Sequence, residues 1–241
     1  MSAKKPLVIL QLYPRDMNIY GDHGNALVLA QRAKWHGYAP KLISYNPGDS
    51  FPRDVDIIVG GGGQDSGQDN IQNDLLRIGP TLKQLAEDNT PMLMICGLYQ
   101  LFGHSFKTQD GQIIEGIGLL DITTVAGPER LIGNIVTQSD LFGEIIGYEN
   151  HSGQTTLGSD IQPLGTVIRG AGNNGADGFE GALWHNVIGS YLHGSLLPKN
   201  PAITDWLIRQ AAVNKFGKFT PGDIDDNFAA LARRHALKRP R

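Results

Sequence analysis

The first hundred residues alternate between short apolar runs and longer segments in which apolar residues recur at helical spacing. The helical segments cover 25–37 and 71–85. Gly79-Pro80 lies inside the second pattern, which predicts either two short helices or a kink there. Continuous apolar strands separated by helices are typical of βαβ units in a buried parallel sheet. Strands are predicted at 7–13, 41–45, 56–60 and 91–96, with a further helix at about 97–104.

After about residue 112 the pattern changes, because strand-like segments follow one another with turn signals between them. We expect these segments to form an antiparallel or mixed extension of the sheet. A strand within 187–197 then leads to an amphipathic helix over 201–215, whose apolar residues are expected to face the core. No linker divides the chain. The prediction is a single α/β domain over 1–220, followed by a C-terminal helix and basic tail over 221–241.

Composition narrows the range of functions. The net charge of −3 gives no basic surplus, so nothing supports a nucleic-acid partner. One cysteine in 241 residues excludes a disulfide framework and is typical of a reducing compartment. No stretch approaches the roughly 18 consecutive apolar residues that span a bilayer, and the start of the chain lacks the pattern of a signal peptide. We expect a cytoplasmic protein without an integral membrane segment.

The single cysteine, Cys96, lies where the apolar run 92–95 meets the next predicted helix. A nucleophile at the carboxyl end of a parallel strand stands at the edge of the sheet where open α/β folds bind ligands. Backbone N–H groups at the start of the following helix favour a thiolate and can stabilise an oxyanion. The alternative is a plain core residue, because free cysteines are among the most buried residue types. The position at the strand end favours the catalytic interpretation.

Four consecutive glycines, 60–63, follow another predicted strand. Such a loop lets backbone amides approach a ligand closely. The phosphate-binding pattern G-x-x-x-x-G-K-[ST] does not occur in the chain, so an oxyanion hole is the more specific use of this loop. Gly97 and Gly62 would supply its two N–H groups. A flexible turn without a catalytic role is the alternative.

A cysteine nucleophile needs a base, and His193 follows the apolar strand that begins near residue 187. A histidine at one strand end can reach a cysteine at the end of another. Of the seven histidines, His151 in the segment YENHSGQT is the competing candidate, because the others fall in helices or turns without a matching context. Taken alone, either histidine is more often a structural residue than a catalytic one.

These features occur together with further motifs, and the set is far more specific than any one of them. The motifs are NIYGDHGN (18–25), GGGQD (61–65), ICGLYQLFG (95–103), IEGIGLL (114–120), RLIG (130–133), GYENHSGQT (147–155) and GSYLHGSLL (189–197). With them the chain resembles the class I, triad-type glutamine amidotransferases. Within that class it is similar to the branch that includes cobyric acid synthase, and most similar to the GatD family of small glutaminase subunits. The resemblance covers about residues 7–215.

The resemblance implies a flavodoxin-like fold with a mostly parallel central sheet flanked by helices. It implies hydrolysis of L-glutamine to glutamate and ammonia, with Cys96 as nucleophile and His193 as base. Arg130 and Gln100 would contact the substrate. The ammonia would pass to a MurT-like subunit of the Mur ligase family, in a heterodimer that amidates D-glutamate of lipid II to D-isoglutamine in peptidoglycan synthesis. ATP and Mg²⁺ are expected on that subunit, with no metal or cofactor in this chain, and the complex would reach lipid II at the inner face of the membrane.

Two departures from the wider class concern the catalytic residues. The class has a glycine two residues after the cysteine and a small residue two before it, whereas this chain has Leu98 and Met94. The turn must therefore accommodate bulk, and Leu98 is expected to line the pocket. Triad enzymes also place a glutamate two residues after the histidine, where this chain has Ser195. Either the site is a dyad, or the third member is one of Glu149, Asp16 and Asp22.

Three other functions stay open on the sequence alone. The chain could supply ammonia to another acceptor, such as a corrinoid carboxylate, although cobyric acid synthases usually carry the ATP domain in the same chain. A non-catalytic regulatory subunit would have no chemical reason to keep the cysteine, the histidine and the glycine loop. A cysteine hydrolase acting on a different amide would keep all three, and reaction with glutamine analogues would distinguish it from a glutaminase.

Overall fold

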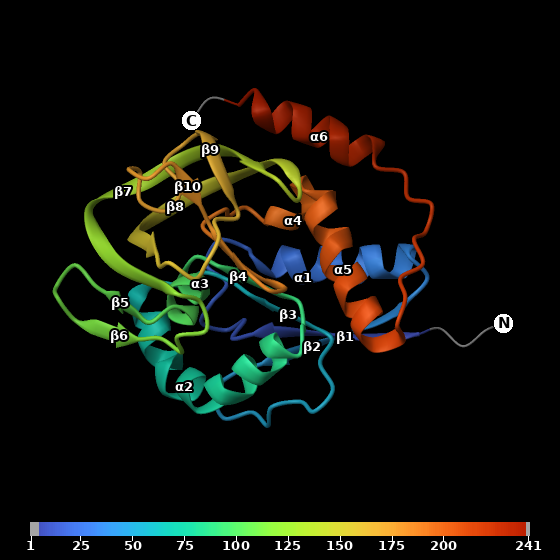
Figure 1. Ribbon diagram of the computed structural model, residues 1–241, viewed down its shortest axis with the longest axis horizontal. Coiled ribbons are helices and arrows are strands. Elements are labelled where there is room, and N and C mark those ends of the chain that lie inside the picture. Colours follow the sequence, from blue (N-terminus) through green and yellow to red (C-terminus); the bar gives the residue numbers. More distant parts are fainter. Residues whose placement is uncertain (1–4, 240–241) are drawn as a thin grey trace.

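The computed structural model describes residues 5–239. The centre of this described part is a six-stranded sheet with the order β2-β1-β3-β4-β12-β11 (Figure 1). Its first five strands are parallel to their neighbours, and the edge strand β11 is antiparallel to β12. This order of parallel strands is flavodoxin-like, and folds of this kind bind ligands at the carboxyl ends of the strands. The strands are β1 (Pro6–Leu12), β2 (Ala39–Tyr45), β3 (Ile57–Gly60), β4 (Met92–Ile95), β11 (Ala182–Trp184) and β12 (Val187–Ser190).

Helices cover both faces of this sheet, with α1 (His23–Trp35) and α5 (Pro201–Phe216) on one face and α2 (Asp65–Glu87) and α3 (Gly97–Phe102) on the other (Figure 1). Strands β3 and β4 are buried along their whole length, which explains their continuous apolar sequence. The helix α2 continues through Gly79-Pro80, so the expected division into two short helices is excluded. Pro80 is exposed, and water can therefore hydrate the carbonyl that loses its N–H partner.

The strand-rich second half forms a sheet of its own rather than an extension of the first. The order is β10-β9-β7-β5-β6, and β8 pairs with β7. The strand-like segments before and after residues 127–129, which the sequence pattern predicts as separate strands, join into the single long strand β7. Because β7 and β8 pair along most of their length, they satisfy their own backbone hydrogen bonds and need no edge of the first sheet. The strands are β5 (Ser105–Lys107), β6 (Ile113–Glu115), β7 (Ile122–Ser139), β8 (Gly143–Leu157), β9 (Gly165–Arg169) and β10 (Phe179–Glu180).

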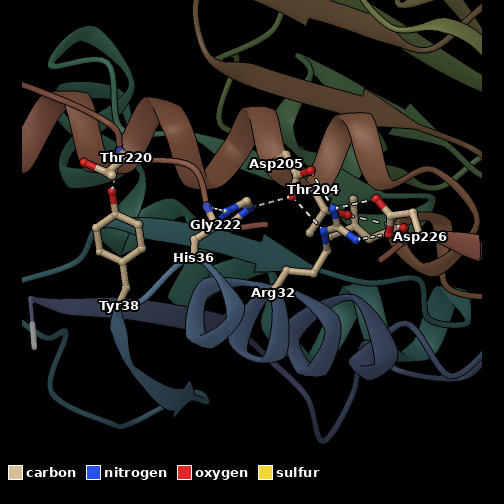
Figure 2. Close-up of polar contacts among 9 residues, drawn as sticks. Arg32, His36, Tyr38, Thr204, Asp205, Thr220, Gly222 and Asp226 are labelled. Atoms are coloured by element: carbon tan, nitrogen blue, oxygen red, sulfur yellow. Dashed lines mark hydrogen bonds and ion pairs between the residues drawn. The ribbon is translucent and has the colours of Figure 1, made fainter. Parts of the chain in front are cut away.

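The segment after α5 folds back along α1 and ends in the expected C-terminal helix, α6 (Asn227–Leu237) (Figure 1). Figure 2 shows how polar contacts hold this segment. The buried Arg32 guanidinium of α1 donates to Asp205 of α5 at 2.6 and 2.7 Å and to Asp226 at 2.6 Å. Two further hydrogen bonds run from Gly222 N–H to His36 Nδ1 and from Thr220 N–H to the Tyr38 hydroxyl.

The predicted boundary between residues 220 and 221 stays a prediction, and the last two residues of the basic tail lie outside the described residues. Buried Ile203 and Leu207 place the apolar side of α5 in the core, as expected. Between residues 5 and 239, no helix combines the length and apolar character needed to cross a membrane.

Candidate active site

The catalytic candidates lie at the carboxyl edge of the parallel sheet. The glycine loop follows β3, Cys96 follows β4, and His193 comes shortly after β12. Because β3, β4 and β12 are neighbours, their ends lie side by side. A Cβ atom on Gly62 would lie 2.8 Å from His193 Cε1 and 3.0 Å from Cys96 Cβ. Gly62 therefore lies between the predicted nucleophile and the predicted base, and only a residue without a side chain fits there.

Cys96 occupies a strained turn between β4 and α3. Its backbone has φ 51° and ψ −103°, which is unfavourable for a residue other than glycine. Backbone hydrogen bonds hold the turn on both sides, from Cys96 N–H to Ser190 O at 2.8 Å and from Gln100 N–H to Cys96 O at 2.9 Å. The side chain is 6% exposed and borders a cavity. A plain core cysteine needs neither a strained backbone nor a cavity, so this geometry favours a nucleophile.

The bulky residues around the cysteine are accommodated by a glycine on the neighbouring strand. A Cβ atom on Gly60 would lie 2.2 Å from Leu98 Cδ1 and 3.1 Å from Met94 Sδ. Both large side chains are fully buried. The expectation that Leu98 lines the pocket is therefore wrong, because the missing side chain of Gly60 creates the space that Leu98 fills inside the core.

His193 is buried, and its ring is held from two sides. Its Nδ1 lies 3.3 Å from Asp22 Oδ2, and the Tyr20 ring lies against it with 4.4 Å between ring centroids. Its Nε2 makes no hydrogen bond to any described residue. This nitrogen is therefore available to exchange a proton with the thiol or the substrate.

Two negative groups stabilise the charged form of His193. Burial alone would lower the pKa of the imidazole, but the charge of the Cys96 thiolate and the hydrogen bond to Asp22 raise it to about 10. At neutral pH the histidine is then an imidazolium, which can give a proton to a leaving group next to the Cys96 sulfur.

Of the three acids considered for a third member, the structure brings Asp22 to the histidine. Glu149 instead accepts hydrogen bonds from Ala171 N–H at 2.8 Å and Gly172 N–H at 2.9 Å. Asp16 lies beside Asn70, whose amide is 3.5 Å from its carboxylate. The structure therefore brings Asp22 to His193 and gives Glu149 and Asp16 other partners.

The expected oxyanion hole needs one correction. Gly62 N–H donates to Asp22 Oδ2 at 2.9 Å, so this amide points toward the acid and away from the position of an oxyanion. The next amide, Gly63 N, lies 3.2 Å from where a Cβ atom of Gly97 would stand. Within the described chain neither Gly63 N–H nor Gly97 N–H donates to another group. These two amides form the better pair of donors next to Cys96.

A cavity of about 450 Å³ opens next to Cys96. Arg130 of β7 borders it, and its guanidinium is held by hydrogen bonds to Asn150 Oδ1 at 3.0 Å and to the Tyr20 hydroxyl at 3.3 Å. Arg130 is thus placed to bind an anionic group of a ligand in the cavity. Gln100 also borders the cavity, but its amide is engaged by Gln68 at 2.9 Å and by the Tyr191 hydroxyl at 3.1 Å. It supports the wall of the cavity.

The competing histidine, His151, has a structural environment. Its ring stacks on Tyr191 with centroids 3.6 Å apart, and its Nδ1 lies 2.6 Å from Gly153 O. Burial, together with the charges of His193 and Arg130, lowers the pKa of His151 to about 4, against the raising effect of its hydrogen bonds to the backbone. It is therefore neutral at physiological pH and has no contact that would make it the base for Cys96.

Sequence reasoning missed three residues of this site. Tyr20 packs on His193, and Gln68 and Tyr191 hold Gln100. Tyr20 and Tyr191 belong to motifs that carry the family resemblance, which was the available signal. Gln68 lies in the first turns of α2 among other polar residues, and its sequence context gave no signal.

Comparison with known proteins agrees with this geometry. Residues 8–201 match the family described as CobB/CobQ-like glutamine amidotransferase domain. The chain is 40% identical to "Lipid II isoglutaminyl synthase (glutamine-hydrolyzing) subunit GatD" of Staphylococcus aureus, over 97% of this chain and 96% of that protein. It is 36% identical to the protein of the same name from Streptococcus pneumoniae, over 88% of this chain and 83% of that one.

Solved structures show the same fold at low identity. PurLQS from Thermotoga maritima gives a TM-score of 0.58 at 17% identity, covering 87% of this chain and 98% of that one. A further structure described as a glutamine amidotransferase also gives 0.58, at 12% identity, with 85% and 99% covered. Fold, site geometry and sequence similarity agree, and the chain belongs to the CobB/CobQ-like glutamine amidotransferase family.

Proposed function

We propose that this chain is the glutaminase subunit of a two-component amidotransferase. The observation that carries the proposal is the arrangement of Cys96, which borders the cavity, with His193 beside it and Asp22 at the His193 ring. Similarity supports it, because relatives that match nearly the whole chain are named glutamine-hydrolyzing subunits. A non-catalytic scaffold would not require the strained backbone at Cys96.

The proposed reaction has two steps. The Cys96 thiolate attacks the side-chain amide carbon of L-glutamine, and the His193 imidazolium protonates the amide nitrogen as the C–N bond breaks and ammonia leaves. The neutral His193 then takes a proton from water, whose oxygen attacks the glutamyl thioester. Glutamate is released, and the thiolate–imidazolium pair is restored.

The surrounding groups have distinct tasks in this proposal. Asp22 holds the His193 ring and stabilises its charge, which makes it the third member of a triad. The N–H groups of Gly97 and Gly63 stabilise the oxyanion of each tetrahedral intermediate. Loss of one such donor typically costs about 10²–10³ in kcat. Arg130 binds the α-carboxylate, because a guanidinium forms paired charge-assisted hydrogen bonds with a carboxylate.

The ammonia acceptor is proposed to lie on a second subunit. The two GatD relatives are named as subunits of lipid II isoglutaminyl synthase, which supports a second subunit. We propose that this subunit is a MurT-like member of the Mur ligase family that forms a heterodimer with the chain. It would bind ATP and Mg²⁺ and use the ammonia to amidate D-glutamate of lipid II. This chain then needs no cofactor of its own, and its place at the inner face of the membrane depends on the complex.

The test is glutamate release from L-glutamine by the chain co-purified with its Mur-ligase-like partner. Cys96→Ala should abolish release while circular dichroism and complex formation stay unchanged. Addition of lipid II, ATP and Mg²⁺ to the wild-type complex should yield amidated lipid II. If the intact complex releases no glutamate, the glutaminase proposal fails. Release without amidation of lipid II would overturn only the proposed acceptor.

A further inference from the structure

The cavity beside Cys96 is bordered by one basic and one acidic residue. Arg130 lies on strand β7, and Asp65 is the first residue of helix α2. Apart from Cys96, the other bordering residues are glycine, amide, hydroxyl or aromatic residues, together with the neutral His151. The cavity thus offers two fixed charges of opposite sign to whatever occupies it.

Neither charge is neutralised inside the protein. Arg130 is held by uncharged groups, Asn150 and Tyr20, and makes no ion pair with a described residue. Among residues 5–239, Asp65 has no side-chain hydrogen bond or ion-pair partner, although it is exposed at the cavity. The two side chains do not pair with each other. Two unpaired opposite charges on one cavity match a ligand that is itself a zwitterion.

We propose that Asp65 binds the α-ammonium of the substrate glutamine and thereby selects the free amino acid. This inference rests on the proposed glutaminase function, in which Arg130 takes the α-carboxylate of the same carbon. Glutamine within a peptide, or glutamine lacking its α-ammonium, would leave Asp65 without a partner. The site would then discriminate against both by the loss of one charge-assisted hydrogen bond.

Other residues at the cavity are poorly suited to an ammonium group. The Gln100 amide is already engaged by Gln68 and Tyr191. The Nδ1 atom of His151 is engaged by Gly153 O, and the ring carries no negative charge. An ammonium leaving water is best compensated by a carboxylate, and Asp65 is the carboxylate present at this cavity.

A simpler role for Asp65 is stabilisation of the α2 N-terminus, where acidic residues are generally favourable. That role would affect folding but not the choice between substrates. The same helix offers a matched control in Asp69, which is exposed and lies one turn further along outside the cavity. Comparing Asp65→Asn with Asp69→Asn therefore separates helix stability from substrate recognition.

The experiment measures kcat and KM of the intact complex for L-glutamine and for 4-carbamoylbutanoate. The second compound has the carboxylate and the amide of glutamine but no α-ammonium. Asp65→Asn should raise KM for L-glutamine by about 10- to 100-fold with little change in kcat, because a contact present in both ground and transition states is lost. Wild type and Asp65→Asn should use 4-carbamoylbutanoate equally well, and Asp69→Asn should match the wild type with both.

A second measurement is independent of turnover. The rate at which 6-diazo-5-oxo-L-norleucine, which carries an α-ammonium, labels Cys96 should fall in Asp65→Asn by a similar factor, as measured by mass spectrometry. An equal loss with both substrates, or no loss with L-glutamine, would overturn the role of Asp65 and leave the glutaminase function standing. A wild-type complex that neither hydrolyses glutamine nor reacts with the analogue would overturn the proposed function, and this inference with it.

Discussion

Replacing Glu180 with glutamine should make the stability of the protein less dependent on pH. The Glu180 side chain is fully buried in strand β10. Its Oε1 accepts hydrogen bonds from Ser190 Oγ at 2.6 Å and from Tyr191 N–H at 2.9 Å. Its Oε2 is buried without a hydrogen-bond partner in the described chain. Glutamine keeps the accepting oxygen and removes the carboxyl group that can ionise.

The size of this pH-dependent change in the free energy of unfolding follows from the environment of the Glu180 carboxyl group. Burial, and to a smaller extent the charge of Glu149, raise the pKa of Glu180 from 4.5 to about 7 against the lowering effect of its hydrogen bonds. An acid whose pKa is raised in the folded state contributes most stability while protonated, and loses that contribution as the pH rises through the folded-state pKa. At about 1.4 kcal/mol for each pKa unit, the wild type should lose about 3 kcal/mol between about pH 4.5 and about pH 8 through this group.

The assay is urea unfolding of wild type and Glu180→Gln across that pH range, followed by tryptophan fluorescence. From the low-pH end of this range to the high-pH end, the free energy of unfolding of Glu180→Gln should rise by about 3 kcal/mol relative to that of the wild type. Other titrating groups, such as His151 and His193, change in both proteins and cancel in the difference. The control is Glu115→Gln, at an exposed position. Over the same pH range, its free energy of unfolding should change by less than about 0.5 kcal/mol relative to that of the wild type. Parallel pH curves for wild type and Glu180→Gln would refute the reasoning.

Two further predictions concern the catalytic acid and the C-terminal segment. Asp22→Asn should lower kcat for glutamine about 10²-fold or more, because the variant can no longer stabilise the charged ring of His193; steady-state kinetics at unchanged fold would show this, and an unaffected kcat would favour a dyad. Arg32→Ala should lower the free energy of unfolding by about 2 kcal/mol, because Asp205 and Asp226 lose their shared partner. This estimate is below the usual cost of breaking a buried pair because both carboxylates are about one third or more exposed; an unchanged urea midpoint would contradict it.

Local pattern was enough to predict the strands and helices of the first sheet and to bring the predicted nucleophile Cys96 and the predicted base His193 to one edge of it. The buried strands of the first sheet carry continuous apolar sequence, and the helices between them carry apolar residues at helical spacing. Strands β4 and β12 are parallel neighbours, so their carboxyl ends lie at the same edge of the sheet. Cys96 follows β4 and His193 comes shortly after β12, which brings the two residues together. The family motifs then narrowed the chemistry to amide hydrolysis.

Tertiary structure decided three features that the sequence pattern left open. They are the acid that contacts His193, the second amide proposed as an oxyanion donor, and the formation of a second sheet. Asp22 and His193 are separated by 171 positions in sequence, and their contact depends on how the loop after β1 folds over the sheet. Asp22 also accepts a hydrogen bond from Gly62 N–H, and for this reason we propose Gly63 N–H, instead of Gly62 N–H, as an oxyanion donor.

The sequence by itself determined the strands and helices of the first sheet and the meeting of Cys96 with His193 at its edge, because these depend on periodicity and on the ends of adjacent parallel strands. Tertiary structure alone decided which acid contacts His193, which amide of the glycine loop that acid engages, and where the β7–β8 pair lies. The physical reason is that a polar side chain or amide can satisfy its hydrogen bonds with many partners at similar free energy. Only the folded geometry fixes which partner comes within about 3 Å.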